Sequence, residues 1–252
     1  MINLTHLRYQ VDLFHQELPP LPPFQVPPDS GIAAIIDHTL LKPEGMPAQI
    51  DRLCQEARQH HFAAVCVNPI FTAQVHKLLE GSNVLTCSVV GFPLGATPSA
   101  AKCFEARLCV EAGSQEIDMV IPIGLLKARE YSAVLEDIQA VVETSHAGGA
   151  IVKVILEMAL LTQEEKIAGC LLSQAAGAEF VKTSTGFGPH GATVEDVNLM
   201  RRVVGPSSQT KVKAAGGIRS LTDARAMLRA GADRLGSSAG VKIMQELKAE
   251  GA

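Results

Sequence analysis

Ile151-Val-Lys-Val-Ile-Leu156 and Glu179-Phe-Val-Lys-Thr183 are two runs of mainly β-branched and small apolar residues, separated by a segment with helical periodicity at residues 163–176. Runs of this composition are typical of strands that are buried on both faces of a parallel sheet. Gly177 follows the helical segment directly, where a C-terminal cap is expected. The stretch therefore predicts a strand–helix–strand unit with parallel strands.

The same alternation of strand and helix extends in both directions, from about residue 31 to the end of the chain. The expected strands are Ile32–Ile36, Ala63–Val67, Val84–Val90, Glu116–Ile121, Ile151–Leu156, Glu179–Thr183, Lys211–Ala215 and Arg234–Gly236. The expected helices include Ser99–Glu111, Arg129–His146, Gln163–Ala176, Val194–Val203 and Leu221–Ala230, and Gly113, Gly177 and Gly231 are in cap positions. An open doubly wound sheet usually has fewer strands and a GxGxxG loop after the first strand, which is absent here. Eight units therefore favour an α/β fold, a single (β/α)8 TIM barrel over residues 31–252.

Residues 1–30 are predicted to form an additional N-terminal helix and a spacer. Leu4, Leu7, Val11, Phe14 and Leu18 follow one another at intervals of three and four residues, which places them on one face of a helix. Six prolines between positions 19 and 28 then end the helix and stiffen the chain. An extra helix packed on the outside of the barrel is the preferred interpretation, and a partner-binding helix is the alternative.

The composition excludes several classes of protein. Hydrophobic residues make up 47% of the 252 residues and charged residues 19%, enough apolar material for a large core. The net charge of −4 includes no long basic or acidic block, which argues against nucleic acid as a partner and leaves room for a small anionic substrate. The six cysteines form no CxxC pair, and no apolar run suits a signal segment or a membrane span. We expect a cytoplasmic protein without a membrane partner; a homo-oligomer is neither predicted nor excluded.

Three lysines, Lys153, Lys182 and Lys213, lie inside the expected strands five, six and seven. A buried ammonium is costly, and three of them in one barrel indicate a site that uses an amine to form a Schiff base with a carbonyl compound. If Lys182 and Lys213 converge to about 5 Å, their repulsion of roughly 3 kcal/mol would lower one pKa by about two units. Asp118 would then be the acid–base partner. For a single lysine, the alternative is an amine that reaches solvent or a helix carboxylate, and Lys153 stays undecided.

A second group of residues is suited to binding an anion. Gly216 and Gly217 follow the seventh strand, and Gly236, Ser237 and Ser238 follow the eighth and precede a helix. Glycines allow backbone amides to approach an anion, and loops after strands seven and eight of such barrels commonly bind phosphate. Thr185 and Gly186, after strand six, would complete the site.

Other polar residues are less informative. His60, His61 and His76 show no metal-binding spacing, so no metal site and no cofactor are expected. Asp37, His38 and Thr39 are expected at the end of the first strand, where they either contact substrate or are structural. Cys66 ends the second strand and is either near the pocket or a buried, unreactive thiol.

Several strings together resemble one known family. They are Asp37-His-Thr-Leu-Leu-Lys-Pro43, Ala64-Val-Cys-Val-Asn-Pro69, Glu116-Ile-Asp-Met-Val120, Val181-Lys-Thr-Ser-Thr-Gly-Phe187, Lys213-Ala-Ala-Gly-Gly-Ile-Arg219 and Arg234-Leu-Gly-Ser-Ser238. Their order and spacing from about residue 31 to 245 resemble the deoxyribose-phosphate aldolases, which are class I aldolases. The resemblance implies cleavage of 2-deoxy-D-ribose 5-phosphate to acetaldehyde and D-glyceraldehyde 3-phosphate, the reverse condensation, and a place in deoxyribose phosphate catabolism.

The resemblance also implies roles for individual residues. Lys182 matches the Schiff-base lysine, Lys213 the charged neighbour and Asp118 the carboxylate of a proton relay. The positions that match phosphate ligands are Gly186, Gly216, Gly217, Gly236 and Ser238, and those that match the pocket wall are Lys153, Asp37, Thr39 and Cys66.

One position departs from the family pattern. Ala239 replaces the third of three hydroxyl residues that many members have after the eighth strand. The departure puts phosphate affinity in question but not the aldol chemistry. Two alternatives remain from the residues alone: a metal-dependent aldolase or sugar-phosphate isomerase on the same barrel, and a catalytically silent protein that binds phosphorylated sugars.

Overall fold

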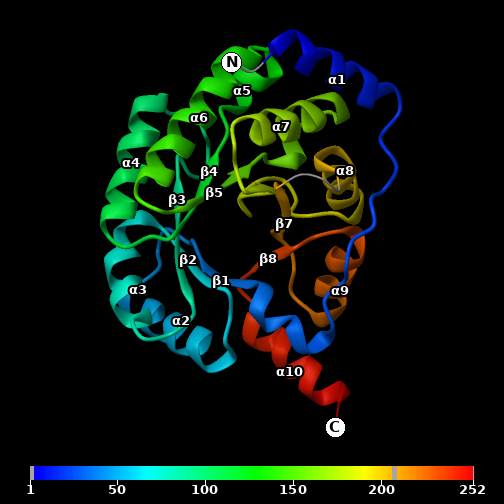
Figure 1. Cartoon of the computed structure of the whole chain (residues 1–252). Coiled ribbons are helices and arrows are strands. Elements are labelled where there is room, and N and C mark those ends of the chain that lie inside the picture. Colours follow the sequence, from blue (N-terminus) through cyan, green and yellow to red (C-terminus); the bar gives the residue numbers. More distant parts are fainter. Residues whose placement is uncertain (1–2, 206–208, 252) are drawn as a thin grey trace.

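The computed structural model describes residues 3–205 and 209–251, and these form a closed barrel of eight parallel strands (Figure 1). Each strand pairs with the next one in the sequence, and β8 closes the barrel against β1. The strands are β1 (Ile36–Leu40), β2 (Ala64–Val67), β3 (Leu85–Val90), β4 (Glu116–Val120), β5 (Ile151–Ile155), β6 (Phe180–Lys182), β7 (Lys211–Ala215) and β8 (Arg234–Ser237). The predicted TIM barrel is confirmed.

Helices surround the barrel on the outside, as the view along it shows (Figure 1). They are α1 (Leu4–Gln16), α2 (Pro47–His60), α3 (Thr72–Leu79), α4 (Ser99–Glu111), α5 (Ile123–Lys127), α6 (Tyr131–Ala147), α7 (Gln163–Ala175), α8 (Val194–Val204), α9 (Leu221–Ala230) and α10 (Gly240–Glu250). Short 3-10 turns lie at Asp29–Gly31, Ala33–Ile35, Pro69–Phe71 and Met158–Leu160. None of the helices in the part of the chain described here is long and apolar enough to cross a membrane.

Capping explains why several helices begin and end where the sequence predicts. Thr162 and Glu165 form a reciprocal capping box at the start of α7, and Ser220 does the same with Asp223 at the start of α9. Gly231, with φ of 111°, ends α9 in the left-handed conformation that a side chain would disfavour. The bounds of α4 and α9 are those predicted, whereas the helix expected from residue 129 begins only at residue 131.

The first strand was predicted in the wrong place. The run Ile32–Ile36 forms the 3-10 turn Ala33–Ile35, and β1 begins at Ile36. A short apolar run fits a buried turn as well as a buried strand, and Ile32 and Ile36 are fully buried here. As a consequence, Asp37 and His38 lie within β1, where they pair with β2 and β8, and not at the rim beyond the strand.

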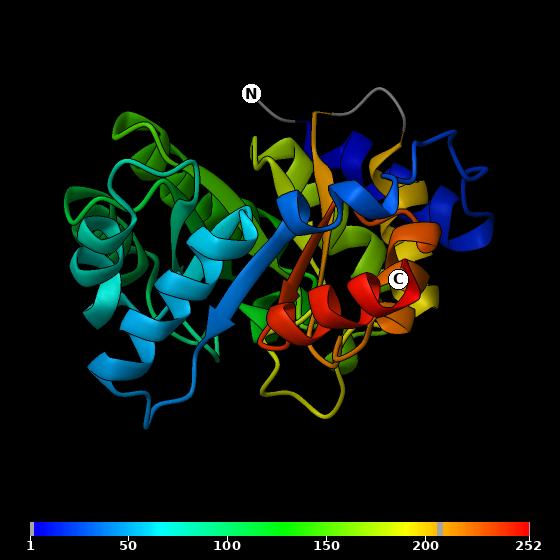
Figure 2. The same ribbon diagram turned by 90° about the horizontal axis from the view of Figure 1, so that it is seen from below.

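The N-terminal helix packs on the outside of the barrel against α7. Leu7 and Val11 supply its buried face, and Asn3 caps it by accepting a hydrogen bond from the backbone N–H of His6. The proline-rich segment then passes α8 and α9 on the way to β1 (Figures 1 and 2). Asp29, at the end of this segment, forms an ion pair with Arg225 of α9 at 2.6 Å.

Two apolar clusters have different places in the fold. The larger one fills the layer between the strands and the surrounding helices. The smaller one consists of inward residues of β2 and β3 together with Leu41 and Phe92, and its members are Leu41, Ala64, Cys66, Cys87 and Val89, packed by Leu85 and Phe92. The β2–β3 side of the barrel interior is therefore apolar.

Candidate active site

Three lysines converge on one carboxylate inside the barrel. Lys182 Nζ and Lys213 Nζ each donate to Asp118 Oδ2 at 2.7 Å, and Lys153 Nζ donates to Asp118 Oδ1 at 2.8 Å. Asp118, Lys153 and Lys213 are fully buried, and Lys182 is 2% exposed. Parallel strands β4 to β7 present these side chains to the same interior, so the convergence anticipated from the sequence is present.

A further layer of charges surrounds this centre. Lys153 also contacts Glu116 at 2.6 Å, and Lys213 forms an ion pair with Asp37. Arg234 of β8 joins the two acids, with 2.6 Å from its Nε to Asp37 Oδ1 and 2.9 Å from Nη2 to Glu116 Oε1. The network thus contains four basic side chains and three carboxylates. It carries one positive charge in excess when every member is ionised.

The network sets the protonation of most of its members. Burial opposes the ionisation of Asp118, but the three lysines outweigh it and hold its pKa well below the usual range. Burial likewise disfavours charged Lys153 and Lys213, yet Asp118 and the other acids raise the pKa of both ammoniums. The sequence predicts that repulsion between two neighbouring ammoniums lowers one pKa, with Asp118 as acid–base partner. In the structure Asp118 lies between them, and Lys153 and Lys213 are firmly protonated.

A cavity of about 340 Å³ opens at the C-terminal ends of the strands, above this network. It is lined by Thr39, Leu40, Leu41, Lys42, Lys182, Thr185, Gly186, Phe187, Ala215, Gly216, Gly217, Ile218, Arg219, Gly236, Ser237 and Ser238. Of the three interior lysines, only Lys182 is among these residues. A small molecule in the cavity therefore meets the Lys182 amine, while Lys153 and Lys213 lie beneath.

One side of the cavity is built from backbone. Gly186, Gly216 and Gly217 have φ values of 89°, 87° and 79°, which side chains disfavour. Gly191 packs so closely on this loop that an added Cβ would lie 2.2 Å from the Gly216 carbonyl oxygen. Gly236 is at the end of β8, just before α10, whose N-terminal end is electropositive. This side of the cavity is suited to an anion.

Two hydroxyl groups predicted in the site already have protein partners. Ser237 Oγ donates to the carbonyl of Ile218 at 2.7 Å. Thr185 Oγ1 donates to Glu157 and accepts from the backbone N–H of Phe187 at 3.0 Å. Ser238, in contrast, is exposed to the cavity. Backbone amides and Ser238 are thus the donors of the described loops that remain open on this side.

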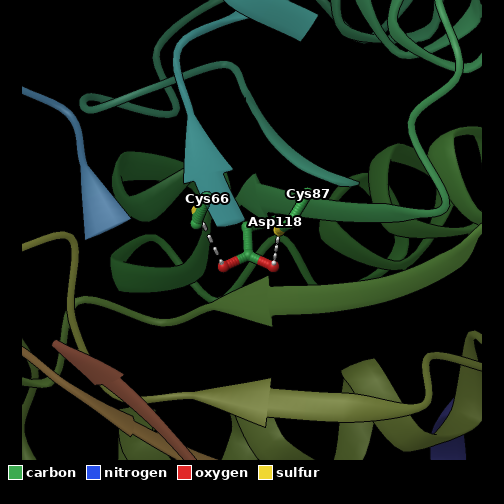
Figure 3. Close-up of side chains that lie close together, drawn as sticks. All are labelled: Cys66, Cys87 and Asp118. Carbon is green, nitrogen blue, oxygen red and sulfur yellow. Dashed lines mark hydrogen bonds between the residues drawn. The ribbon is translucent and has the colours of Figure 1, made fainter. Parts of the chain in front are cut away.

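The other predicted pocket residues occupy different depths. Thr39 lines the cavity and donates its hydroxyl to its own strand, at the carbonyl of Asp37. Cys66 is fully buried, with its Sγ 4.0 Å from Asp118 Oδ2, while Cys87 Sγ lies 3.2 Å from Oδ1 (Figure 3). A hydrogen bond from Cys87 lowers the pKa of Cys66, and burial raises that of Cys87.

Cys66, Cys87 and Asp118 form the one group of possible metal ligands found among the described residues, with donor atoms within 4.8 Å of one another. Both oxygens of Asp118 already accept from lysine ammoniums. A metal cation at this point would face three neighbouring positive charges, so the group does not fit a metal. His38 is not part of this group, and its Nε2 bonds Glu56 of α2 at 2.8 Å.

The sequence reasoning missed several residues of the site. Glu116 and Arg234 complete the charge network, Lys42 and Arg219 line the cavity, and Glu157 holds Thr185. Arg219 ends the turn after the seventh strand that was predicted to bind an anion, and Lys42 lies in the motif Asp37–Pro43, so both had a usable signal. Glu157 gave none: its burial and its φ of 56° become visible only in the folded chain.

Known proteins are similar to this chain in sequence and in fold. Residues 32–246 match the family described as DeoC/LacD family aldolase. The chain is 56% identical over 221 residues to a deoxyribose-phosphate aldolase of Streptococcus equi subsp. zooepidemicus, covering 88% of this chain and 99% of that protein. It is similarly 56% identical over 218 residues to a deoxyribose-phosphate aldolase of Carboxydothermus hydrogenoformans, covering 86% and 95%.

Solved structures are similar over almost the whole chain. The deoxyribose phosphate aldolase of Aeropyrum pernix, described as a tetramer, has a TM-score of 0.81 and 32% identity and covers 97% of both chains. A structure from Coccidioides immitis, provisionally named a deoxyribose-phosphate aldolase, has a TM-score of 0.92 and 43% identity and covers 98% of both chains.

Proposed function

The chain belongs to the DeoC/LacD family of aldolases, and we propose that it cleaves 2-deoxy-D-ribose 5-phosphate to acetaldehyde and D-glyceraldehyde 3-phosphate through a Schiff base on Lys182. The observation that carries this proposal is the position of the Lys182 amine. It faces the cavity from which a substrate enters and shares an Asp118 oxygen with the buried ammonium of Lys213. An amine that is both reachable and next to a cation is suited to attack a carbonyl carbon.

Charge balance supports Lys182 as the neutral amine. With Lys153, Lys213 and Arg234 charged, the three carboxylates of the network are matched, and a fourth cation would be unbalanced in a dry interior. Lys182 has one carboxylate partner, Asp118, whereas Lys153 and Lys213 each contact at least two. Lys182 is therefore the lysine of the network with the fewest carboxylate partners.

The reaction then follows from the chemistry of the amine. The nitrogen of Lys182 adds to the aldehyde carbon C1 of the open-chain sugar, and loss of water gives an iminium ion. The C3 hydroxyl passes its proton through water to the Lys213 amine that the loss of water left neutral, the electrons of the C2–C3 bond move towards the iminium, and D-glyceraldehyde 3-phosphate leaves. Protonation of the remaining enamine at C2 and addition of water release acetaldehyde and restore Lys182.

Asp118 and Lys213 have distinct parts in this scheme. The pKa of Asp118 is held so low by the surrounding lysines that the carboxylate is a weak base at neutral pH. Its part is to hold Lys182 and Lys213 in place and to connect them, since one oxygen contacts both amines. The Lys213 ammonium supplies the proton, through Asp118 or water, when the carbinolamine loses water.

The glycine-lined side of the cavity is proposed to bind the substrate phosphate. Gly186, Gly216, Gly217 and Gly236 offer backbone N–H groups, and Ser238 offers a hydroxyl. Lys42 and Arg219 add positive charge at the opening. These cations offset the missing hydroxyl at Ala239, so phosphorylated sugars are the preferred substrates.

Chemical trapping tests the proposal. Borohydride added together with acetaldehyde reduces the iminium to a stable two-carbon adduct, and peptide mapping should place this adduct on Lys182. The variant Lys182→Met should lose both the adduct and the cleavage of 2-deoxy-D-ribose 5-phosphate. An adduct found only on Lys153 or Lys213 would refute the assignment.

The remaining parts of the proposal concern the cell. The six cysteines are all free thiols in the structure, as in proteins of a reducing cytoplasm. There we propose that the enzyme degrades deoxyribose phosphate, as a homo-oligomer. Light scattering at several protein concentrations would establish the number of subunits.

A further inference from the structure

Two phenylalanines from non-neighbouring strands meet at the mouth of the barrel. Phe92 follows β3 and Phe187 follows β6, and their rings make an edge-to-face contact with 5.4 Å between centroids and 87° between planes. β4 and β5 lie between β3 and β6 in the barrel. The ring contact therefore joins two loops whose strands are not neighbours. Edge-to-face pairs at this distance are favourable.

A carboxylate holds the backbone next to each ring. Glu157, which is 3% exposed, accepts from the backbone N–H of Thr185 at 3.2 Å and from its hydroxyl, and the same hydroxyl accepts from the N–H of Phe187. On the other side, the N–H of Gly91 donates to Glu105 of α4 at 2.7 Å, directly before Phe92. The aromatic contact is thus part of the folded framework.

Beneath the rings lies the apolar side of the barrel interior. Phe92 packs on the cluster that contains Leu41 and Cys66, and Leu41 and Phe187 both line the cavity. Cys66 Sγ points to Asp118 Oδ2, the oxygen that also holds the Lys182 amine (Figure 3). Leu41 therefore connects this apolar cluster with the cavity, and Phe187, next to Gly186 in the loop after β6, contacts Phe92 from the other side.

We infer that Phe92 and Phe187 form a roof over this apolar side of the cavity and limit the aldehyde fragment bound to Lys182 to two carbons. The inference rests on the proposed function, because it assigns the apolar side to the acetaldehyde-derived fragment and the glycine side to the phosphorylated one. Glu157 is a positioning residue for the roof, since it acts through Thr185 on Phe187.

The roof has a consequence for donor choice in the condensation direction. Propanal carries one more methyl group on the carbon that becomes nucleophilic, and this group would meet Leu41, Phe92 or Phe187. Excluding one methyl group from a well-packed apolar pocket changes kcat/KM by about 10-fold to 200-fold. Replacing either ring with a smaller side chain should remove a substantial part of this discrimination.

The test compares donors with D-glyceraldehyde 3-phosphate as the common acceptor. We expect the ratio of kcat/KM for propanal to that for acetaldehyde to rise about tenfold in Phe187→Ala and in Phe92→Ala. Phe104→Ala is the matched control, because Phe104 lies 53% exposed on the outer helix α4. Phe92→Leu and Phe187→Leu, which keep an apolar side chain, should show a smaller rise in the same direction.

Glu157→Gln tests the positioning role. It retains the size of the side chain but weakens the acceptor for Thr185, so the donor ratio should rise while the melting temperature stays close to that of the parent.

Three results would overturn the inference: an unchanged donor ratio in both alanine variants, a change confined to KM for D-glyceraldehyde 3-phosphate, or a parent enzyme that uses both donors equally. The borohydride adduct separates these failures from failure of the proposed function. A Lys182 adduct with an unchanged ratio refutes the roof alone, whereas a parent enzyme without that adduct refutes the Schiff-base assignment.

Discussion

Lys213→Met removes one positive charge from the interior network and should keep Lys182 protonated. Lys213 and Lys182 contact the same Asp118 oxygen at 2.7 Å each, so their nitrogens are at most about 5 Å apart. Without Lys213, Asp118 still attracts a proton on Lys182, and no Lys213 ammonium repels it. In the remaining network, three basic side chains face three carboxylates. The charges are therefore balanced when Lys182 is charged and unbalanced when it is neutral.

The expected magnitude comes from this separation. Two unit charges about 5 Å apart repel by roughly 3 kcal/mol at an effective dielectric constant of about 20, which corresponds to about two pH units. At neutral pH, kcat/KM should therefore fall about 100-fold from the loss of neutral amine alone. The substitution also leaves Asp37 with Arg234 as its main partner, and breaking a buried ion pair of this kind costs about 3 kcal/mol of stability.

The pH dependence of kcat/KM distinguishes this effect from general damage. The rise in activity with pH should shift to the alkaline side, so that part of the loss is recovered at alkaline pH. Lys211→Met is the matched control, because Lys211 lies on the same strand but is exposed and contacts only the ring of Phe180 among the described interactions. A uniform loss at every pH would refute the charge argument and leave Lys213 as a proton donor only.

Three further outcomes are expected. Gly191→Ala should raise KM for 2-deoxy-D-ribose 5-phosphate at least tenfold with little change in adduct formation at Lys182, because its Cβ would push Gly216 away. The control Gly124→Ala should have no effect, because the space around Gly124 is open. An unchanged KM for Gly191→Ala would count against the anion site. Burial lowers the pKa of His38 despite Glu56, so the folded state resists protonation and the free energy of unfolding should decrease as the pH falls below about 6.5. In urea unfolding between pH 7 and 5, His38→Gln should flatten this dependence, and an equally steep slope would assign it to other groups. Prolonged dialysis against a chelator should leave activity intact; inactivation that zinc or magnesium reverses would favour a metal-dependent mechanism.

Much of the fold was accessible from the sequence because parallel strands and amphipathic helices have different periodicities. The bounds of α4 and α9 agree with the prediction, and α9 has a capping box at its start and Gly231 at its end, whereas α4 has no side-chain cap. The first strand was misplaced because Ile32–Ile36 is apolar throughout, and a continuous apolar run contains no period. Only pairing with β2 and β8 shows that the strand begins at Ile36.

The site was predictable to the extent that buried lysines are improbable without a reason. Lys153, Lys182 and Lys213 stood out as single charges in apolar strands, and the structure brings all three to Asp118. Asp118 was predicted as their partner, but Glu116 was not recognisable, since it opens its strand as an ordinary exposed residue would. Burial and pairing across the barrel depend on contacts between residues more than 100 positions apart, such as Glu116 and Arg234.

The asymmetry of the barrel interior connects the charge network with the proposed choice of substrate. The side formed by β6 to β8 presents glycine backbone to the cavity, and Leu41 lines the cavity where it borders the apolar cluster of β2 and β3 on which Phe92 packs. Lys182 lies where the two sides meet, because its amine is fixed by Asp118 from below. A substrate with a charged end and an uncharged aldehyde end can therefore bind in one orientation only, with its aldehyde carbon at the amine. The same arrangement explains why the network lies beneath the cavity: its buried ion pairs hold the charged side chains in one geometry, and of the three lysines only Lys182 lines the cavity.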